Sequence, residues 1–470
     1  MGVVAHYYMD VELQGVLTAV QRSAPEFQNR IGIADSLKMG DMAVAMCENA
    51  NVQAVACLGV DFMSESVSAI LHRNHFGHVP VYRATSAPIG CSLAESAERD
   101  SYRAWLEKEM KNEQALHVVY INTSLETKAV SSSIVPTITC TSSNVLQTML
   151  QASAQVGPDL KILYGPDTYM GENLQTLLDS ILNSSSNDDN NNNNGYWTDE
   201  RIRQELHPAH NRQTLQQLRN KLTVFPSGNC IVHHMFGKSI VQTVRDHYSD
   251  CYVTAHLEVP GEMFSIAMEK SMSHHDNNNA GGGGGGGVVG STSDILRFIA
   301  SHATRAAATP GSTERLRFIL GTEAGMVTSI VKSVQDILEQ TKSQVEVEII
   351  FPVASQAIMG VEGNDDLAIV PGVGGGEGCS TAGGCATCPF MKMNDLDALQ
   401  NIIDMVESGD KEMTLKAHLP PDRLRGKSIN GVKAMDLGVE SIMYMRDFMI
   451  QKELPAELID KVRAGAYTSS

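Results

Sequence analysis

Short runs of apolar residues alternate along this chain with longer stretches in which apolar residues recur every three or four positions. The short runs predict buried strands, and the longer stretches predict helices that cover them. The predicted strands are 53–58, 116–121, 161–164, 251–255 and 317–320, and the clearest helices are 145–155 and 295–308. This alternation favours parallel sheets with helices on both faces, so the predicted fold class is α/β.

The same order of features occurs three times along the chain. A serine at the start of a predicted helix is followed by an apolar run, then by a Gly-x-acid turn, and later by a cysteine. The three sets are Ser36, Gly59 and Cys91; Ser142, Gly165 and Cys230; and Ser291, Gly321 and Cys388. Such a triplication predicts three similar αβα sandwich domains in a pseudo-threefold arrangement, each turning one thiolate toward a shared centre.

The repeat sets the predicted domain boundaries. The first domain is 1–95 with 395–470 as a C-terminal helical layer, the second is 96–228, and the third is 229–394. Within the C-terminal part, Ile442, Met445 and Met449 recur at helix spacing, which predicts a packed face.

Two segments of low complexity interrupt this pattern, at 183–195 and at 274–287. Both are rich in asparagine or glycine and cannot bury apolar surface, so we expect disordered surface insertions. His274 and His275 are potential metal ligands, but the composition around them favours a solvated loop.

The charge and the cysteines narrow the function classes. The net charge is −18, with 54 acidic and 36 basic residues, which argues against a nucleic-acid backbone or an anionic membrane as the main partner. We also find no bilayer-spanning run and no signal segment, and the chain opens directly on a strand pattern, which we interpret as a truncated start. Nine cysteines without a secretion signal predict free thiols or metal ligands rather than a disulfide framework.

Each repeat opens with a strand that ends in two polar residues spaced two apart. Residues i and i+2 of a strand share a face, and the carboxyl ends of parallel strands are where ligands bind. Any one pair could be no more than a satisfied polar strand end. Three pairs at equivalent positions instead predict a site, formed by His6 and Tyr8, Tyr120 and Asn122, and His256 and Glu258.

Hydroxyl residues precede a helical pattern in each repeat. These are Ser36, the Thr141–Ser143 group with Ser142, and the group that contains Ser291 and Thr292. Hydroxyls beside the free N–H groups of a helix N-terminus bind carboxylate or phosphate, although simple capping is the alternative for each one alone. Their repetition predicts a pocket for several anionic groups.

Cysteines supply the sharpest local signal. Cys385 and Cys388 form a Cys-x-x-Cys, and Cys230 precedes His233 by three residues. Zinc would need a second close pair of ligands, which the sequence lacks. With Cys91, the repeats provide three equivalent thiolates and no fourth. That set suits a 4Fe–4S cluster whose open iron acts as a Lewis acid for dehydration.

Two alternatives from other classes stay open at this point. An iron–sulfur redox or electron-transfer protein would use the same thiolates without a substrate, although electron carriers usually close the cluster with four cysteines. A protein that binds sugar phosphates or nucleotides would keep the serines and strand-end pairs but hold no iron.

Many segments, in order along the chain, closely resemble the quinolinate synthase family, in particular its plant type. The segments include AHYYMD at 5–10, ADSLKM at 34–39, LGVDFMSES at 58–66, IGCSLAES at 89–96, VVYINTSLETKA at 118–129, TCTSSNV at 139–145, YGPDTYMG at 164–171, GNCIVHHMFG at 228–237, AHLEVPGEM at 255–263, GSTSDILRFI at 290–299, LGTEAGMVTSIV at 320–331 and GGCATCPFMKMNDL at 383–396.

The resemblance implies condensation of iminoaspartate with dihydroxyacetone phosphate to quinolinate, phosphate and water, in de novo NAD biosynthesis. It implies a 4Fe–4S cluster at the centre of three αβα domains, bound by Cys91, Cys230 and Cys388. It also implies catalytic roles for Tyr8, Tyr120, His6, His256, Glu258 and His233, and substrate-binding roles for Ser36, Asn122, Ser142, Ser291 and Thr292.

Further expectations follow from the resemblance. An aspartate oxidase would supply the iminoaspartate, and a sulfur-transfer or cluster-assembly protein would be a partner. The location would be a plastid, or the cytoplasm otherwise, and the chain could form a homodimer. The plant type carries an upstream sulfur-transfer domain and a transit segment, neither of which this chain shows. Cys385 could form a regulatory disulfide with Cys388 or be a bystander.

Overall fold

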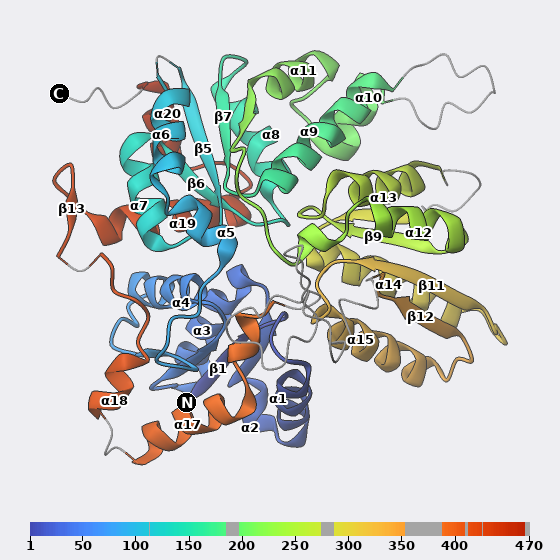
Figure 1. The fold of residues 1–470 in the computed structure, drawn as a ribbon, viewed down its shortest axis with the longest axis horizontal. Helices are drawn as coiled ribbons and strands as arrows, with labels where there is room; N and C mark the ends of the chain where they lie inside the picture. Colours follow the sequence, from blue (N-terminus) through green and yellow to red (C-terminus); the bar gives the residue numbers. More distant parts are fainter. Residues whose placement is uncertain are drawn as a thin grey trace, which may run out of the picture.

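The computed structural model describes residues 1–111, 113–184, 197–273, 286–352, 388–408, 412–424 and 426–465. Within these residues the chain builds three parallel sheets of four strands each and a small antiparallel hairpin. The α/β class predicted from the sequence is confirmed. Figure 1 shows the three sheets, with their helices, placed around a common centre. No helix of the described residues is long and apolar enough to cross a bilayer.

The first sheet has the strand order β2-β1-β3-β4. Its strands are β1 (Gly2–His6), β2 (Ile31–Ala34), β3 (Val55–Leu58) and β4 (Val81–Arg83). Its helices are α1 (Val11–Ser23), α2 (Pro25–Gln28), α3 (Ser36–Ala50) and α4 (Asp61–Arg73), and α5 (Ser92–Ala97) and α6 (Asp100–Glu109) lead to the second sheet. Every residue of β1 and of β3 is buried, as expected for parallel strands covered on both faces.

The second sheet has the order β6-β5-β7-β8. Its strands are β5 (Ala115–Tyr120), β6 (Thr137–Cys140), β7 (Lys161–Gly165) and β8 (Leu222–Val224). Its helices are α7 (Leu125–Ile134), α8 (Val145–Val156), α9 (Thr168–Asn183), α10 (Asp199–Arg201), the π-helical turn η2 (Ile202–Leu206) and α11 (Arg212–Lys221).

The third sheet repeats this order, as β10-β9-β11-β12. Its strands are β9 (Tyr252–His256), β10 (Gly287–Gly290), β11 (Arg315–Gly321) and β12 (Glu346–Ile350). Around it lie the turn η3 (His233–Met235) and the helices α12 (Lys238–His247), α13 (Gly261–Ser273), α14 (Thr292–Ala307) and α15 (Met326–Thr341). Because all three sheets share one strand order, the triplication read from the sequence is a repeat of structure as well.

The predicted low-complexity insertions lie mostly outside the described residues. Asn183 still belongs to α9 and Gly287 already begins β10, so both insertions are shorter at these ends than predicted. The expectations for 185–195 and 274–285, including His274 and His275, and the question of Cys385, fall on residues outside the described ranges.

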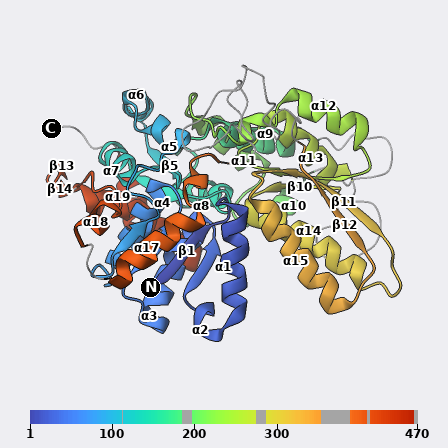
Figure 2. The ribbon, with the colours of Figure 1, turned by 60° about the horizontal axis from the view of Figure 1, so that its bottom comes forward.

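The C-terminal part divides between two sheets. It comprises the turn η5 (Met391–Met393), α17 (Leu396–Ser408), α18 (Glu412–Ala417), the hairpin β13 (Ser428–Ile429) and β14 (Val432–Lys433), α19 (Ala434–Gln451) and α20 (Ala456–Arg463). Figures 1 and 2 show α17 beside the first sheet, as predicted.

Helix α19 instead packs mainly against α7 and β6 of the second sheet. Ser441 shares a hydrogen bond of 3.0 Å with Thr139 of β6, and Arg446 reaches Asp41 of α3 at 2.6 Å. The assignment of 395–470 as a layer of the first domain therefore does not describe α19. Ile442 and Met445 are buried, which agrees with the predicted packed face.

The hydrophobic core is continuous between the first and second sheets and extends into the inner side of the third. A separate cluster fills the space between β11, α14 and α15 of the third sheet, around Phe298, Phe318 and Ile330. Figures 1 and 2 both show α1 beside α15, and Arg22 and Asp336 form an ion pair of 2.7 Å between them. The three sheets thus share a packed centre, where their strand ends meet.

Candidate active site

The site lies at the carboxyl ends of the first strand of each sheet. In each sheet, the first strand (β1, β5 or β9) lies between the second and the third strand along the chain. The strand order therefore reverses at the first strand, and open parallel sheets bind ligands at such a switch point. A cavity at this point is lined by residues from all three sheets. They are His6, Tyr8, Asp35, Ser36 and Met63; Tyr120, Ile121, Asn122, Thr141, Ser142 and Ser143; and His256, Glu258 and Thr292.

The predicted strand-end pairs therefore meet in one cavity. Two of them share a local design, because His6 Nδ1 accepts the Tyr8 N–H at 3.2 Å and His256 Nδ1 accepts the Glu258 N–H at 3.3 Å. An accepting Nδ1 leaves the proton of the neutral ring on Nε2. Burial lowers the pKa of both histidines to about 4, so both rings are neutral hydrogen-bond donors near pH 7.

Two phenols bring protons into the cavity. Tyr120 donates its hydroxyl proton to Glu258, and the hydroxyls of Tyr8 and Thr292 lie 3.3 Å apart. Burial, together with the charge of Glu258, raises the pKa of both tyrosines well above the usual value. Both phenols therefore stay protonated at neutral pH and can give a proton to a bound molecule.

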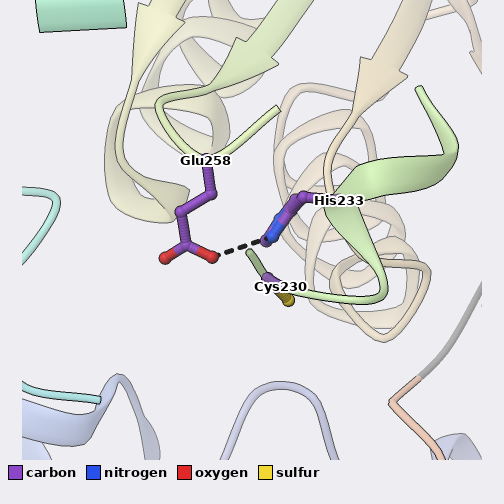
Figure 3. Close-up of side chains that lie close together, drawn as sticks. All are labelled: Cys230, His233 and Glu258. Carbon is purple, nitrogen blue, oxygen red and sulfur yellow. Dashed lines mark ion pairs between the residues drawn. The ribbon is translucent and has the colours of Figure 1, made fainter. Parts of the chain in front are cut away.

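Glu258 joins the cavity to a second group of side chains. Its Oε2 lies 2.8 Å from Nδ1 of His233, and both side chains are buried. Burial alone would raise the pKa of Glu258, but His233, His256 and the bond from Tyr120 lower it to about 2. Figure 3 shows Glu258 and His233 turned toward each other, with Cys230 beside the pair. Glu258 is thus an anion at neutral pH.

A fully buried lysine, Lys128, holds the turn that carries Asn122. No pattern in the sequence marks this lysine. Lys128 Nζ donates to the Ile121 carbonyl at 3.1 Å, to Thr123 Oγ1 at 2.9 Å and to the Thr123 carbonyl. Burial lowers the pKa of Lys128 to about 7. Its three oxygen partners hold the turn that follows β5, and with it Asn122, in place.

The helix starts behave differently from one another. Ser36 and Thr292 are the first residues of α3 and α14 and line the cavity. Ser291 is the cap of α14, and its hydroxyl donates to Asp294 at 2.6 Å, so the capping alternative describes Ser291. Thr292, rather than Ser291, is the counterpart of Ser36 in the third repeat.

The three predicted cysteines occupy equivalent turns. The carbonyl of each accepts the N–H four residues further on, in Glu95, His234 and Lys392. Backbone N–H groups two or three residues on also hydrogen-bond to the sulfurs of Cys91, Cys230 and Cys388, as in the first turn of a helix. All three cysteines are free.

Each Gly-x-acid turn binds the cysteine segment of its own repeat. Asp61 N–H donates to the Ile89 carbonyl at 2.9 Å, and Thr168 N–H donates to the Gly228 carbonyl at 2.6 Å. In the third repeat, the Cys388 N–H donates to Glu323 at 3.2 Å. These turns belong to the repeat seen in the sequence, and in the structure each of them is tied to the segment that carries its cysteine.

Comparisons with known proteins identify the family. The sequence profile of the family described as Quinolinate synthetase A protein matches residues 1–423. The chloroplastic quinolinate synthase of Nicotiana tabacum is 45% identical over 98% of this chain. Those of Arabidopsis thaliana and Oryza sativa subsp. japonica are 44% identical over 98% and 43% identical over 99% of the chain. The chain belongs to the quinolinate synthetase A family. It spans 61% of the length of the tobacco relative and 63% of that of the rice relative.

The three cysteines fit the iron–sulfur cluster expected for a quinolinate synthetase A protein. Burial raises the pKa of all three thiols, to about 11 for Cys91 and about 12 for Cys388, and the charge of Glu258 raises that of Cys230 further. A cation bound by the sulfurs would offset this cost of the thiolate form. Cys91 and Cys388 both lie near enough to Cys230 to raise the pKa of its thiol, and cysteine thiolates are the usual ligands of such clusters.

Proposed function

We propose that this chain condenses iminoaspartate with dihydroxyacetone phosphate to quinolinate, releasing phosphate and water. The observation that carries the proposal is the junction at Glu258, which lines a cavity of hydroxyl, phenol and imidazole groups and also lies beside Cys230. The family, and the name quinolinate synthase that its relatives carry, support the same reaction. An electron carrier would need no such cavity beside its cysteines, and the comparisons give that alternative no support.

Helix starts supply the anion-binding groups in this proposal. Ser36 and Thr292 lie at the N-termini of α3 and α14, and Ser142 and Ser143 lie just before α8. Free N–H groups and hydroxyls at helix N-termini bind carboxylate and phosphate without a basic surface. The two carboxylates of iminoaspartate and the phosphate of the triose are therefore bound by helix starts of different sheets. This arrangement places the two reactants next to each other in a fixed orientation.

Side chains of the cavity move the protons. Tyr120 and Tyr8 are protonated phenols that donate to a developing hydroxide or carbonyl oxygen. The anionic Glu258 takes up a proton released by the substrate and passes it to Tyr120, which restores the phenol. The neutral His6 and His256 donate from Nε2 and fix the orientation of a bound oxygen. Asn122, held by the turn that Lys128 braces, adds an amide to the same surface.

We propose that Cys91, Cys230 and Cys388 bind a 4Fe–4S cluster. When bound, the cluster supplies an iron without a cysteine ligand, which is a Lewis acid for a leaving hydroxyl group. The N–H groups around each sulfur, and the Gly-x-acid turns behind them, position the three ligands before the cluster is bound.

The test uses anaerobically reconstituted protein. We expect visible absorption from the cluster and formation of quinolinate from the two substrates, and we expect Cys388→Ser to lose both. Cys47→Ser is the matched control, because Cys47 is buried in α3 away from the repeat of cysteine turns, and it should keep both properties. A Cys388→Ser protein that keeps its cluster and its activity would refute the ligand assignment.

The names of the plant relatives bear on where this chain acts. The curated plant relatives are named chloroplastic, which supports a plastid for this chain. We propose that an aspartate oxidase supplies the unstable imine and that a sulfur-transfer or cluster-assembly protein loads the site. The homodimer stays a prediction.

A further inference from the structure

One group of side chains at the centre has the composition of a mononuclear metal site. The sulfur of Cys230, a ring nitrogen of His233 and a carboxylate oxygen of Glu258 all lie within 4.8 Å of one another. Among the described residues it is the one group of three such ligand atoms this close together. Cys230 and His233 belong to the same helical turn, and Glu258 follows β9, so two elements meet at this point (Figure 3).

One ring nitrogen of the histidine in this group has no partner in the part of the chain that the structure describes. His233 is 0% exposed, and its Nδ1 lies 2.8 Å from Glu258, whereas its Nε2 has no hydrogen-bond partner among the described residues. Buried polar atoms are nearly always paired, so an unpaired ring nitrogen at this depth points to a ligand. A metal ion would bind a ring nitrogen and the carboxylate together.

Tyr120 orients the carboxylate for that purpose. It donates to Oε1 of Glu258, while Oε2 faces His233. In metal sites, such a bond from outside the ligand shell fixes the free carboxylate oxygen in the direction of the ion. The group therefore has a thiol, an imidazole, an oriented carboxylate and a supporting donor.

We propose that, when the iron–sulfur cluster is absent, Cys230, His233 and Glu258 bind a single Zn²⁺ ion. One thiolate, one imidazole and one carboxylate are ligands that zinc takes, and three protein ligands leave the fourth tetrahedral position open. With zinc–ligand bonds of about 2.0–2.3 Å, tetrahedral ligand atoms lie about 3.5 Å apart, and the three ligand atoms here all lie within 4.8 Å of one another, close to the spacing that zinc needs. Zinc also binds such ligands more tightly than ferrous iron does.

The two other cysteines separate this site from the cluster site. Cys91 and Cys388 do not belong to the group of ligand atoms that all lie within 4.8 Å of one another. If the proposed function holds, zinc would occupy Cys230, which is also a cluster ligand, and Glu258, which also lines the cavity. Bound zinc would then block cluster assembly until it is removed.

The test measures Zn²⁺ binding by apoprotein in competition with a coloured zinc chelator, without iron or sulfide. We expect one tight site per chain, and we expect Cys230→Ser, His233→Gln and Glu258→Gln each to weaken it on the order of 100-fold. Cys91→Ser and Cys388→Ser are the controls and should bind as the unaltered protein does. Equal weakening by these controls, or unchanged binding by His233→Gln, would overturn the proposal.

X-ray absorption by the zinc-loaded, unaltered chain gives a second measurement that requires no variant. One sulfur with nitrogen and oxygen ligands at about 2.0–2.2 Å is the expected shell, and three sulfurs would contradict it. The two proposals fail separately. A chain that binds zinc through these residues but builds no cluster and makes no quinolinate would refute the proposed function alone, and a chain that makes quinolinate but lacks the tight zinc site would refute this inference alone.

Discussion

Single buried side chains couple parts of this chain that are far apart in sequence. Asn394, which is fully buried, accepts the Gly59 N–H at 3.0 Å and donates to the carbonyls of Gly59 and Met391 at 3.4 and 3.1 Å. It thus ties the turn after β3 to the turn that begins at Cys388. Water cannot replace these bonds at such depth.

We expect Asn394→Ala to lower the free energy of unfolding by about 2–4 kcal/mol, because it leaves the Gly59 backbone groups unpaired in the interior. Chemical denaturation measures this change. Asn220 is an exposed asparagine that shares one hydrogen bond with Gln216, so Asn220→Ala should change the free energy of unfolding by no more than about 0.5 kcal/mol. Similar values for the two variants would show that the buried bonds are not what stabilises this turn.

A buried histidine of strand β5, in the second sheet, makes the stability of the protein depend on pH. His117 is 0% exposed, and its Nε2 pairs with the Tyr102 hydroxyl at 2.8 Å. Burial lowers its pKa from 6.5 to about 3. Between pH 6.5 and pH 3, His117 is therefore protonated in the unfolded chain but neutral in the folded chain. The contribution of neutral His117 to the free energy of unfolding is complete above pH 6.5 and is lost as the pH falls toward 3.

His117→Gln removes this dependence and also weakens the bond to Tyr102. We expect the variant to be less stable than the unaltered protein at pH 7, and the gap to narrow by about 1.4 kcal/mol per pH unit below pH 6.5. Denaturation at pH 7, 6 and 5 measures the gap. His6 and His256 have the same sign of shift, but they are present in both proteins and cancel in the difference. A gap that stays constant with pH would contradict the assignment.

At the scale of elements, two helical glycines differ in whether a neighbouring helix packs against them. A Cβ on Gly438 of α19 would lie 2.6 Å from the Leu125 carbonyl oxygen at the start of α7, whereas a Cβ on Gly15 of α1 would meet no atom within 4 Å. The first glycine permits α19 to approach α7. The second only adds flexibility to a helix.

We therefore expect Gly438→Ala to destabilise the protein by about 1–3 kcal/mol through displacement of α19, and Gly15→Ala to stabilise it by about 0.5–1 kcal/mol through helix propensity. Thermal unfolding of both variants is the measurement. The same sign of change for both would show that the α19–α7 contact tolerates the extra methyl group.

Elements were predictable where burial leaves a pattern in the sequence. Strand β5 reads as an apolar run that only His117 interrupts, because both of its faces are covered, and α14 shows its period over four turns. Strands β4 and β8 have three residues each, too few for any period. The apolar face of α19 was visible, but the pattern carries no information about which sheet it covers.

The candidate site was predictable to the extent that it repeats. Pairs such as His6 and Tyr8 follow strands, and the alternation of strand residues places them on one face. Met63 and Lys128 lie in α4 and α7, the helices that follow β3 and β5, and the residue pattern of these helices does not show which side chain turns toward the site. The bond from Cys388 to Glu323 joins residues far apart in sequence, so its role emerges only in the fold.

At the scale of the whole molecule, the cavity exists only while all three sheets are in place. No sheet with its flanking turns supplies more than six of the 14 residues that line the cavity. A ligand that fills the cavity should therefore stabilise the three sheets together rather than one of them.

We expect quinolinate, at about 100 times its Kd, to stabilise the folded protein by about 2.7 kcal/mol and to slow hydrogen exchange after β1, β5 and β9 alike. Hydrogen exchange with mass spectrometry resolves these segments. Nicotinate, which lacks one carboxylate, is the matched control and should protect them less at the same concentration. Protection confined to one sheet would contradict a cavity that all three build.

The identical strand order of the three sheets has a consequence for how such a centre arises. Three copies of one unit place three comparable turns at a common point, so a single cysteine acquired before the copies diverged would have sufficed to gather three sulfurs. Differences between the copies, such as Tyr8, Asn122 and Glu258 after their respective strands, then let a symmetric frame distinguish the two ends of an unsymmetric molecule. A symmetric trimer of one such unit should still bring three sulfurs together, but it would bind a ligand equally well in three equivalent orientations.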